Sequence, residues 1–288
     1  MAFIGYNKSG AIVMDSFNRQ QFIIPGSLPF LEIRTTTDSI LPYAEHFHSS
    51  FSLGLIHAGR TRFSLGKDTY VAESGDIVLI APEQTHSCNP VEKMPRSYQM
   101  AHLDASWFHG SLGMTLYQQE GLRVAEPLVR DTELFAKVRD LFAMARAETA
   151  ATGLVLTALL TKMHSRYQCF LPAPAAQRPA AAALTERSVT ERVLAGEYSV
   201  SKLAQSAGVR RESFSRFFRR TTGLPPSSYL HCLRLEYGRH LLQEGCSVAE
   251  AAAATGYVDQ SHFHRMFVRY CSVTPGCYRK NQSHPYKK

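Results

Sequence analysis

Two stretches in the last third of the chain repeat each other, and this repeat limits the possible folds more than any other feature. Residues 200–229 align with residues 248–278 at an offset of 48 positions up to Gly208 and Gly256, and at an offset of 49 after them. Each copy has a short helical pattern, a glycine that suits a turn of positive φ, and a second helical pattern. The sequence therefore predicts two helix-turn-helix units. The aligned pairs are Val200 and Val248, Ala204 and Ala252, Phe214 and Phe263, Arg216 and Arg265, Phe218 and Phe267, Pro226 and Pro275, and Tyr229 and Tyr278.

Four side chains of the second copy could be zinc ligands, but the first copy has serine or threonine at the same positions. The unit therefore needs no metal to fold. His262 and His264 are two residues apart, so on a helix they point about 200° apart, whereas paired helical ligands sit at i and i+4. We interpret His264 as part of a polar stripe that would face DNA, with His262 at its flank. The four candidates are His262, His264, Cys271 and Cys277, and their counterparts are Ser213, Ser215, Thr222 and Ser228.

The second helix of each copy has an apolar face that predicts core packing, opposite the polar stripe. The segment between the copies has prolines near its start, Gly245 as a stop, and about 18 helical residues, which span about 27 Å. Successive major-groove faces on one side of DNA are about 34 Å apart, so one connector could place both helices on the same side. The expected core residues are Phe214, Phe217, Phe218, Phe263, Met266 and Phe267, with Tyr229, Leu233, Tyr237 and Leu241 along the connector.

The positive charge of the chain lies entirely in this last part. Residues 184–288 hold 16 Lys and Arg against 8 Asp and Glu, a net charge of +8, whereas residues 1–183 hold 16 of each. A basic module joined to a neutral one indicates a polyanionic partner. The change coincides with the Pro- and Ala-rich stretch 171–183, "LPAPAAQRPAAAA", which we expect to be a linker.

The part before the linker predicts an α+β domain. Between about residues 20 and 105, short runs rich in Val, Ile, Phe and Thr are separated by Gly, Asp and Pro, which is typical of a sandwich or barrel. Helical spacing follows from about 131 to 168. Its two apolar stripes are either core or partly a partner surface, and they comprise Leu134, Val138, Leu141, Phe142 and Met144, then Leu154, Leu156, Leu159, Leu160 and Met163.

Several protein classes receive no support from the sequence. No apolar run is long enough to cross a bilayer, and the first residues lack the apolar region of a secretory leader. The six cysteines are scattered, as expected for thiols of a cytoplasmic protein. No hydrolase, zinc-protease or phosphate-loop motif is present, so we expect no enzyme.

The sequence resembles the AraC/XylS family of bacterial transcription regulators. The match covers residues 184–280, and "GYVDQSHFHRMFVRYCSVTPGCYR" resembles the family's ordered signature. Ser272 departs from it, because the family usually has glycine there, as the first copy does at Gly223. The resemblance implies that each second helix enters a major groove, where arginine can pair with guanine and glutamine with adenine. The implied base-reading residues are Arg211, Glu212, Ser215, Arg216, Asp259, Gln260, Ser261, His264 and Arg265, with Arg219, Arg220, Arg269 and Lys280 on phosphates. Asp259 could instead be a helix N-cap.

The first domain resembles the family's sensor, a cupin-like β-barrel followed by two helices. His46, His48 and His86 match positions that hold a metal together with a glutamate in metal-binding cupins, but residues 51–53 are Phe, Ser and Leu. Three imidazoles alone could bind zinc, iron or nickel, bind a small molecule by hydrogen bonds, or be structural. We expect a small-molecule site with no metal and no cofactor.

The resemblance implies a multi-domain α+β protein. We expect a cupin-like sensing and dimerisation domain at 1–170, the linker at 171–183, and an all-α domain of two helix-turn-helix units joined by a long helix at 184–288. The implied function is a small-molecule-responsive transcription activator that binds promoter DNA and RNA polymerase as a homodimer, with helices within 131–168 forming the dimer. A cupin metalloenzyme fused to a DNA-binding module and an architectural DNA-binding protein are the alternatives.

Overall fold

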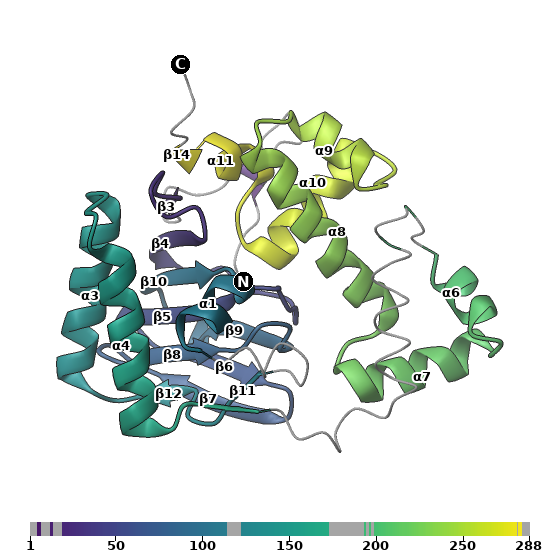
Figure 1. Cartoon of the computed structure of the whole chain (residues 1–288). Helices are drawn as coiled ribbons and strands as arrows, with labels where there is room; N and C mark the ends of the chain where they lie inside the picture. Colours follow the sequence, from purple (N-terminus) through teal and green to yellow (C-terminus); the bar gives the residue numbers. More distant parts are fainter. Residues whose placement is uncertain are drawn as a thin grey trace.

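A computed structural model describes residues 5–6, 12–13, 19–113, 122–172, 193, 196, 199–280 and 282–283. A strand-rich unit and a helical unit pack against each other (Figure 1). Leu171 and Pro172, which we assigned to the linker, belong instead to a strand; the rest of the expected linker lies outside the described residues.

Two sheets form the first unit. The larger has the spatial order β12 (Leu128–Val129), β8 (Ile77–Ile80), β5 (Phe51–Ala58), β10 (Arg96–Leu103), β4 (Leu31–Ser39), β3 (Arg19–Ile23) and β14 (Gln282–Ser283). The smaller has the order β7 (Asp68–Ala72), β6 (Thr61–Leu65) and β9 (His86–Pro90). Two separate pairs are β1 (Gly5–Tyr6) with β2 (Ile12–Val13), and β11 (Leu122–Val124) with β13 (Phe170–Pro172). All of these pairings are antiparallel except that of β14 with β3.

The larger sheet is buried on both faces, and alternate residues of each strand serve different faces. On β5, Phe51, Leu53 and Leu55 point toward helices α3 (Thr132–Arg146) and α4 (Thr152–Tyr167). Ile56 packs with Phe63 of the smaller sheet on the opposite face. The strands expected from the sequence are present, and the two sheets enclose an interior between them.

Helices α3 and α4 cover the outer face of the larger sheet, with α1 (Ala105–Ser111) nearby (Figure 1). The residues of the expected apolar stripes are buried, except that Met144 is half-buried and Leu154 is exposed. Leu154 is 78% exposed, because it lies on the outer side of α4 while Leu156 and Leu160 point inward.

The second unit contains the two predicted helix-turn-helix copies. The helices are α6 (Val200–Ser206), α7 (Arg211–Thr222), α8 (Pro226–Gln243), α9 (Val248–Ala254), α10 (Gln260–Cys271) and α11 (Pro275–Lys280). Gly208 and Gly256 have φ of 66° and 69°, which explains why the repeat keeps a glycine in each turn.

Helix α8 is the predicted connector, and α7 and α10 lie near its opposite ends (Figure 1). Its 18 residues correspond to about 27 Å. The expected apolar stripe of α8 was partly wrong: Tyr237 is 42% exposed. The buried residues of α8 include Cys232, Leu235 and Leu242 instead. They lie on more than one side of the helix, because α8 packs against both helix-turn-helix copies and the first unit.

Candidate functional site

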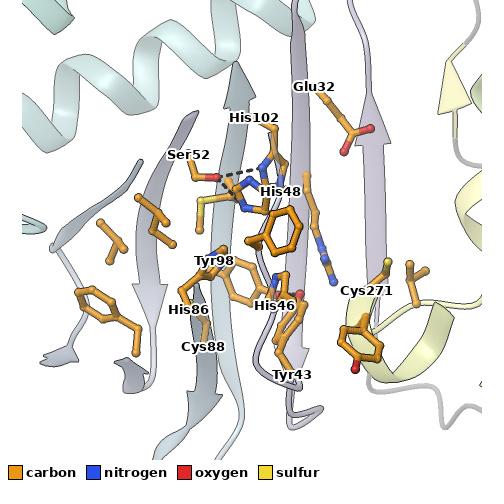
Figure 2. A pocket seen from close by; sticks show the side chains of 18 of the residues that line it. Glu32, Tyr43, His46, His48, Ser52, His86, Cys88, Tyr98, His102 and Cys271 are labelled. Atoms are coloured by element: carbon orange, nitrogen blue, oxygen red, sulfur yellow. Dashed lines mark hydrogen bonds between the residues drawn. The ribbon is translucent and has the colours of Figure 1, made fainter. Parts of the chain in front are cut away.

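A cavity of about 100 Å³ lies between the two units, with walls from both of them (Figure 2). Its floor is the inner face of the sheets, where strand alternation brings polar residues inward from β4, β5 and β10. The helical unit closes the other side with residues of α8, the end of α10, and α11. The polar lining residues include Glu32, Arg34, Tyr43, His46, His48, Ser52, His86, Arg96, Tyr98, His102, Glu236 and Arg239.

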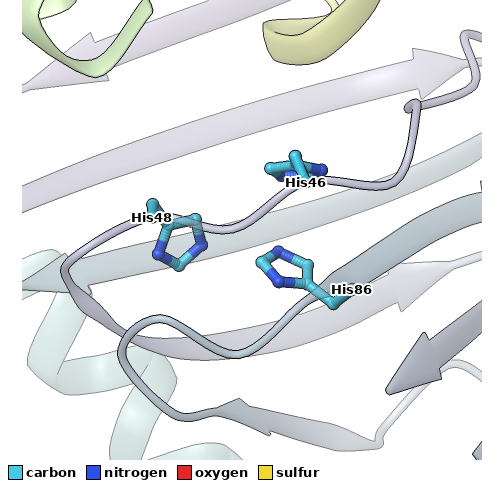
Figure 3. A group of neighbouring side chains, drawn as sticks. All are labelled: His46, His48 and His86. Carbon is cyan, nitrogen blue, oxygen red and sulfur yellow. The ribbon is translucent and has the colours of Figure 1, made fainter. Parts of the chain in front are cut away.

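The three histidines expected from the sequence meet at this cavity (Figure 3). His46 and His48 lie in the segment before β5, and His86 begins β9. The main chains of His46 and His86 exchange two hydrogen bonds, of 2.9 and 2.7 Å, which hold the two segments together. The ring centroids of His46 and His86 are 4.3 Å apart, and those of His48 and His86 are 4.8 Å apart.

Hydrogen bonds to the main chain fix the orientation of each ring. The Nδ1 atoms of His46, His48 and His86 lie 2.9, 2.9 and 2.7 Å from the carbonyl oxygens of Ala44, Ser50 and Gln84, respectively. A carbonyl only accepts, so each Nδ1 carries the proton and each Nε2 is left as an acceptor. The three rings therefore present hydrogen-bond acceptors in one place.

Burial keeps these imidazoles neutral. It lowers the pKa of His86 to about 4. Burial, followed by the neighbouring histidines, holds the pKa values of His46 and His48 well below 6.5. A fourth histidine, His102, is also buried with a lowered pKa, and its Nδ1 lies 3.0 Å from the hydroxyl of Ser52.

The donor atoms of this histidine group are spread more widely than a bound divalent metal ion requires. One nitrogen from each of His46, His48 and His86 lies within 4.8 Å of the others. An ion at their centre would be up to about 2.8 Å away (4.8 Å divided by √3), whereas zinc–nitrogen bonds are about 2.0–2.1 Å. No acidic or cysteine side chain in the described part of the chain completes the group. The hydroxyl of Ser52 lies 3.3 Å from Nε2 of His48, so this nitrogen already has a hydrogen-bonding neighbour.

Two buried arginines add positive charge to the cavity. Arg34 is 7% exposed and Arg96 is 1% exposed, and neither forms an ion pair with any residue that the structure describes. Their guanidinium groups lie 5.2 and 5.9 Å from the ring centroid of Tyr43. The hydroxyl groups of Tyr43 and Tyr98 are 2.7 Å apart (Figure 2).

A third arginine, Arg239 of α8, has a carboxylate partner from the other unit. Its Nη2 donates to Glu32 of β4 at 2.6 Å. Glu32 also accepts from Gln243 at 2.8 Å and from the hydroxyl of Tyr278 at 2.6 Å. This buried network joins the cavity floor to α8 and α11.

The segments that carry the cavity histidines also hold the ends of both second helices. The main-chain N–H of Ala44 donates to the carbonyl of Arg269 near the end of α10. The hydroxyl of Thr85, next to His86, donates to the carbonyl of Thr222 at the end of α7 at 2.8 Å. The side chain of Glu236 on α8 accepts from the N–H of Ser49 at 2.8 Å. The same two segments therefore contact both the cavity and the helices α7, α8 and α10.

The residues expected to read DNA lie mostly on the exposed sides of α7 and α10. Ser215 and His264 are half-buried, and burial lowers the pKa of His264. The carboxylate of Asp259 accepts from the N–H of His262 at 2.6 Å, so it caps α10. The exposed members of the set are Arg211, Glu212, Arg216, Arg219, Arg220, Asp259, Gln260, Ser261, Arg265 and Arg269.

The zinc alternative for the second copy finds no support in the geometry. Cys271 faces the interdomain cavity, and His262 packs edge-to-face with Tyr257 at a centroid distance of 5.1 Å. Among the described residues, only the three cavity histidines form a cluster of side chains with the composition of a metal site.

Sequence reasoning did not identify Arg34, Arg96, His102 and Arg239 as lining residues. The signal was present in part: polar residues at alternate positions of "LEIRT" (31–35) and "RSYQMAHL" (96–103) point to one face of a strand. Arg239 had no such signal, because its position depends on how the two units pack.

Comparisons with known proteins agree with this two-part arrangement. Residues 36–163 match the family model described as an AraC-like ligand binding domain, and residues 203–281 match a helix-turn-helix domain model. The chain is 23% identical over 227 residues to the uncharacterized HTH-type transcriptional regulator YbfI of Bacillus subtilis, covering 76% of this chain and 81% of that protein. It is 24% identical over 267 residues to the HTH-type transcriptional activator RhaR of Salmonella dublin, covering 84% and 89%.

Among solved structures, unsaturated fatty acid bound ToxT from Vibrio cholerae has a similar fold. The TM-score is 0.55 at 12% identity, and the alignment covers 92% of this chain and 97% of that chain. No helix in the described part of the chain has the length and hydrophobicity needed to traverse a bilayer.

Proposed function

The chain belongs to the AraC family of DNA-binding transcriptional regulators, and we propose that a small molecule in the interdomain cavity controls its two DNA-reading helices. The observation that carries this proposal is the double role of two short segments. Residues 42–49 and 85–86 bring His46, His48 and His86 to the cavity and also hold the ends of α7 and α10.

DNA binding is assigned to α7 and α10, each entering a major groove. Arg216 and Arg265 occupy equivalent positions in the repeat and are exposed, so each is placed to read a guanine edge. Arg219, Arg220 and Arg269 lie nearer the helix ends and are assigned to phosphates, which add affinity without specificity. Asp259 has a smaller role in base reading, because its carboxylate caps α10.

The contacts with the first unit restrain the helices in the ligand-free protein. Each second helix must be free to settle into its groove, and bonds such as Thr85 to Thr222 limit that freedom. A ligand that binds better when these bonds are broken shifts the population toward the DNA-competent arrangement. By analogy with RhaR, whose name describes an activator, we propose activation at promoters through RNA polymerase.

The remaining assignments follow from the same family membership. A regulator of this kind acts in the cytoplasm, without enzymatic activity and as a homodimer. The outer side of α3 and α4, with Leu154 exposed, is the proposed dimer surface. The solved structure of ToxT with a bound unsaturated fatty acid supports a small-molecule effector for this architecture.

The test begins with selection of genomic DNA fragments by the purified full-length protein. A few enriched promoters are expected, and their sequences provide the specific site. Thr85→Val then removes the hydroxyl that binds Thr222 while keeping the side-chain shape. We expect it to raise affinity for that site about 5-fold without ligand, equivalent to one hydrogen bond of about 1 kcal/mol.

The matched control is Thr69→Val on exposed β7, which should leave DNA affinity unchanged. Equal affinity for wild type and Thr85→Val would contradict control of α7 through this contact. Broad enrichment without a shared motif would favour an architectural DNA-binding protein.

A further inference from the structure

We propose that the cavity binds a small organic acid, with its carboxylate held between Arg34 and Arg96 and its apolar body between the two sheets. This inference rests on the proposed function, because it names the chemical class of the effector. No comparison assigns either arginine a role.

Arg34 and Arg96 carry buried positive charge without a carboxylate counter-charge, although Arg34 donates to Gln20 at 2.8 Å and to Thr36 at 3.3 Å. A buried cation is unfavourable unless a counter-charge or hydrogen bonds replace water. Arg239 meets that need with Glu32, whereas Arg34 and Arg96 have no carboxylate partner among the described residues. Both line the same cavity, so an anion entering it would supply the missing charge.

The guanidinium group of Arg96 has one N–H donor without a partner. Arg96 donates to the carbonyl of Cys88 at 2.8 Å, and at 3.3 Å to the carbonyl of Leu41 and the hydroxyl of Thr61. Its Nε is buried and has no hydrogen-bond partner. Buried polar atoms without partners are rare in proteins, and this one belongs to a side chain that lines the cavity.

Arg34 and Arg96 also create a positive electrostatic field around Tyr98. Burial alone would raise the pKa of Tyr98, yet Arg34 and Arg96 hold it below its ordinary value. Tyr98 lies 5.3 Å from the guanidinium carbon of Arg96, measured to the ring centroid. The two arginines therefore favour negative charge in their vicinity, which also disfavours a divalent cation at the nearby histidines.

The other residues that line the cavity indicate what the rest of the ligand must be like. Apolar side chains from both sheets line the cavity, and the Nε2 atoms of the histidines are acceptors that suit a hydroxyl or amine donor. The volume of about 100 Å³ is smaller than the ~150 Å³ cavity that admits benzene, so the acid is compact. The apolar residues are Ile56, Phe63, Val78, Ile80 and Met100.

The experiment compares acids with their uncharged amides. Butanoate and butanamide, and propanoate and propanamide, are added at millimolar concentration to the full-length protein, and binding is measured by calorimetry and thermal shift. We expect at least one acid to bind and its amide to bind 10-fold more weakly or not at all. Arg34→Gln and Arg96→Gln should each weaken binding of that acid by about 10- to 100-fold, as expected for charged hydrogen bonds.

The control is Arg60→Gln, which removes a guanidinium from an exposed ion pair with Glu73 and should leave acid binding unchanged. If Arg96→Gln does not fold, as judged by circular dichroism, Arg34→Gln carries the test. Binding of no acid, equal binding of acid and amide, or binding that survives both arginine variants would overturn the proposal. If acid and amide bind equally and both change the affinity for DNA, the organic-acid proposal fails but the proposed function stands. If a ligand binds in the cavity without changing the affinity for DNA, the proposed function fails.

Discussion

The hydroxyl of Ser272 donates a hydrogen bond of 2.8 Å to the carbonyl oxygen of Pro42. Ser272 ends α10 with φ of 51°, in the left-handed region that favours glycine, and its own carbonyl accepts from Gln20 at 2.7 Å. The departure from the family's usual glycine therefore replaces an easy helix end with an interdomain bond.

Replacing Ser272 with glycine should separate these two effects. Relief of the left-handed backbone gains about 1 kcal/mol, and loss of the hydroxyl bond costs about 1 kcal/mol, so the unfolding midpoint should change little. Affinity for promoter DNA without ligand should nevertheless rise a few-fold, because α10 is released. A large loss of thermal stability, or unchanged DNA affinity, would argue against this account.

Arg265→Ala should weaken binding to the specific site by about 1–3 kcal/mol and relax its sequence preference. Arg216→Ala should do the same at the other half of the site, since the repeat places it equivalently. Binding assays with specific and scrambled DNA measure both effects, with Arg62→Ala at an exposed position of β6 as the charge-matched control. Equal losses on the two DNAs would make the arginine a phosphate contact.

Glu32→Gln should lower the free energy of unfolding by about 3 kcal/mol, because it leaves the half-buried Arg239 without its counter-charge. Urea unfolding of the full-length protein gives this value. Glu73→Gln in the exposed pair with Arg60 is the comparison and should change stability by less than about 1 kcal/mol. Similar effects of the two variants would mean that the Glu32 network does not hold the units together.

The buried histidines predict a loss of stability in mild acid. The pKa of His86 falls from 6.5 to about 4 on folding, so the unfolded chain binds the proton more tightly. The contribution is therefore complete above about pH 6.5 and is lost as the pH falls toward 4. Between pH 7.5 and 5 this amounts to about 2 kcal/mol for His86 alone.

The comparison protein for this effect is His86→Gln, which does not titrate in the window. Urea unfolding at both pH values should show a smaller pH dependence for the variant than for wild type. An identical pH dependence would mean that folding does not shift the pKa of His86.

Metal analysis of the dialysed protein should find far less than one equivalent of zinc, iron or nickel, and a chelator should leave the thermal midpoint unchanged. The reason is the wide spacing of the three histidines and the absence of an acidic ligand from their group in the part that the structure describes. One retained equivalent that His86→Ala abolishes would revive the metalloprotein alternative.

The sequence predicted those features that depend on local pattern. The helix-turn-helix units came from their repeat, the strands from short apolar runs between turn residues, and His46, His48 and His86 from a motif with fixed spacing. Arg34 and Arg96 were missed because one strand alone does not show which alternate face is enclosed. Phe22 and Phe47 belong to the core of the helical unit, a contact that no local pattern encodes. Tyr237 and Leu154 were misplaced because helical periodicity does not say where a packed face ends.

The alternation along β4, β5, β8 and β10 has a consequence for how new specificities arise. Residues of one parity pack against α3 and α4, whereas those of the other parity line the cavity. Substitutions at cavity positions can thus alter ligand preference without disturbing the packing that keeps the domain folded. Related regulators can therefore differ in the ligand they recognise while they share the same fold. The cavity positions of these strands are also the ones to vary in a library of variants with altered ligand preference.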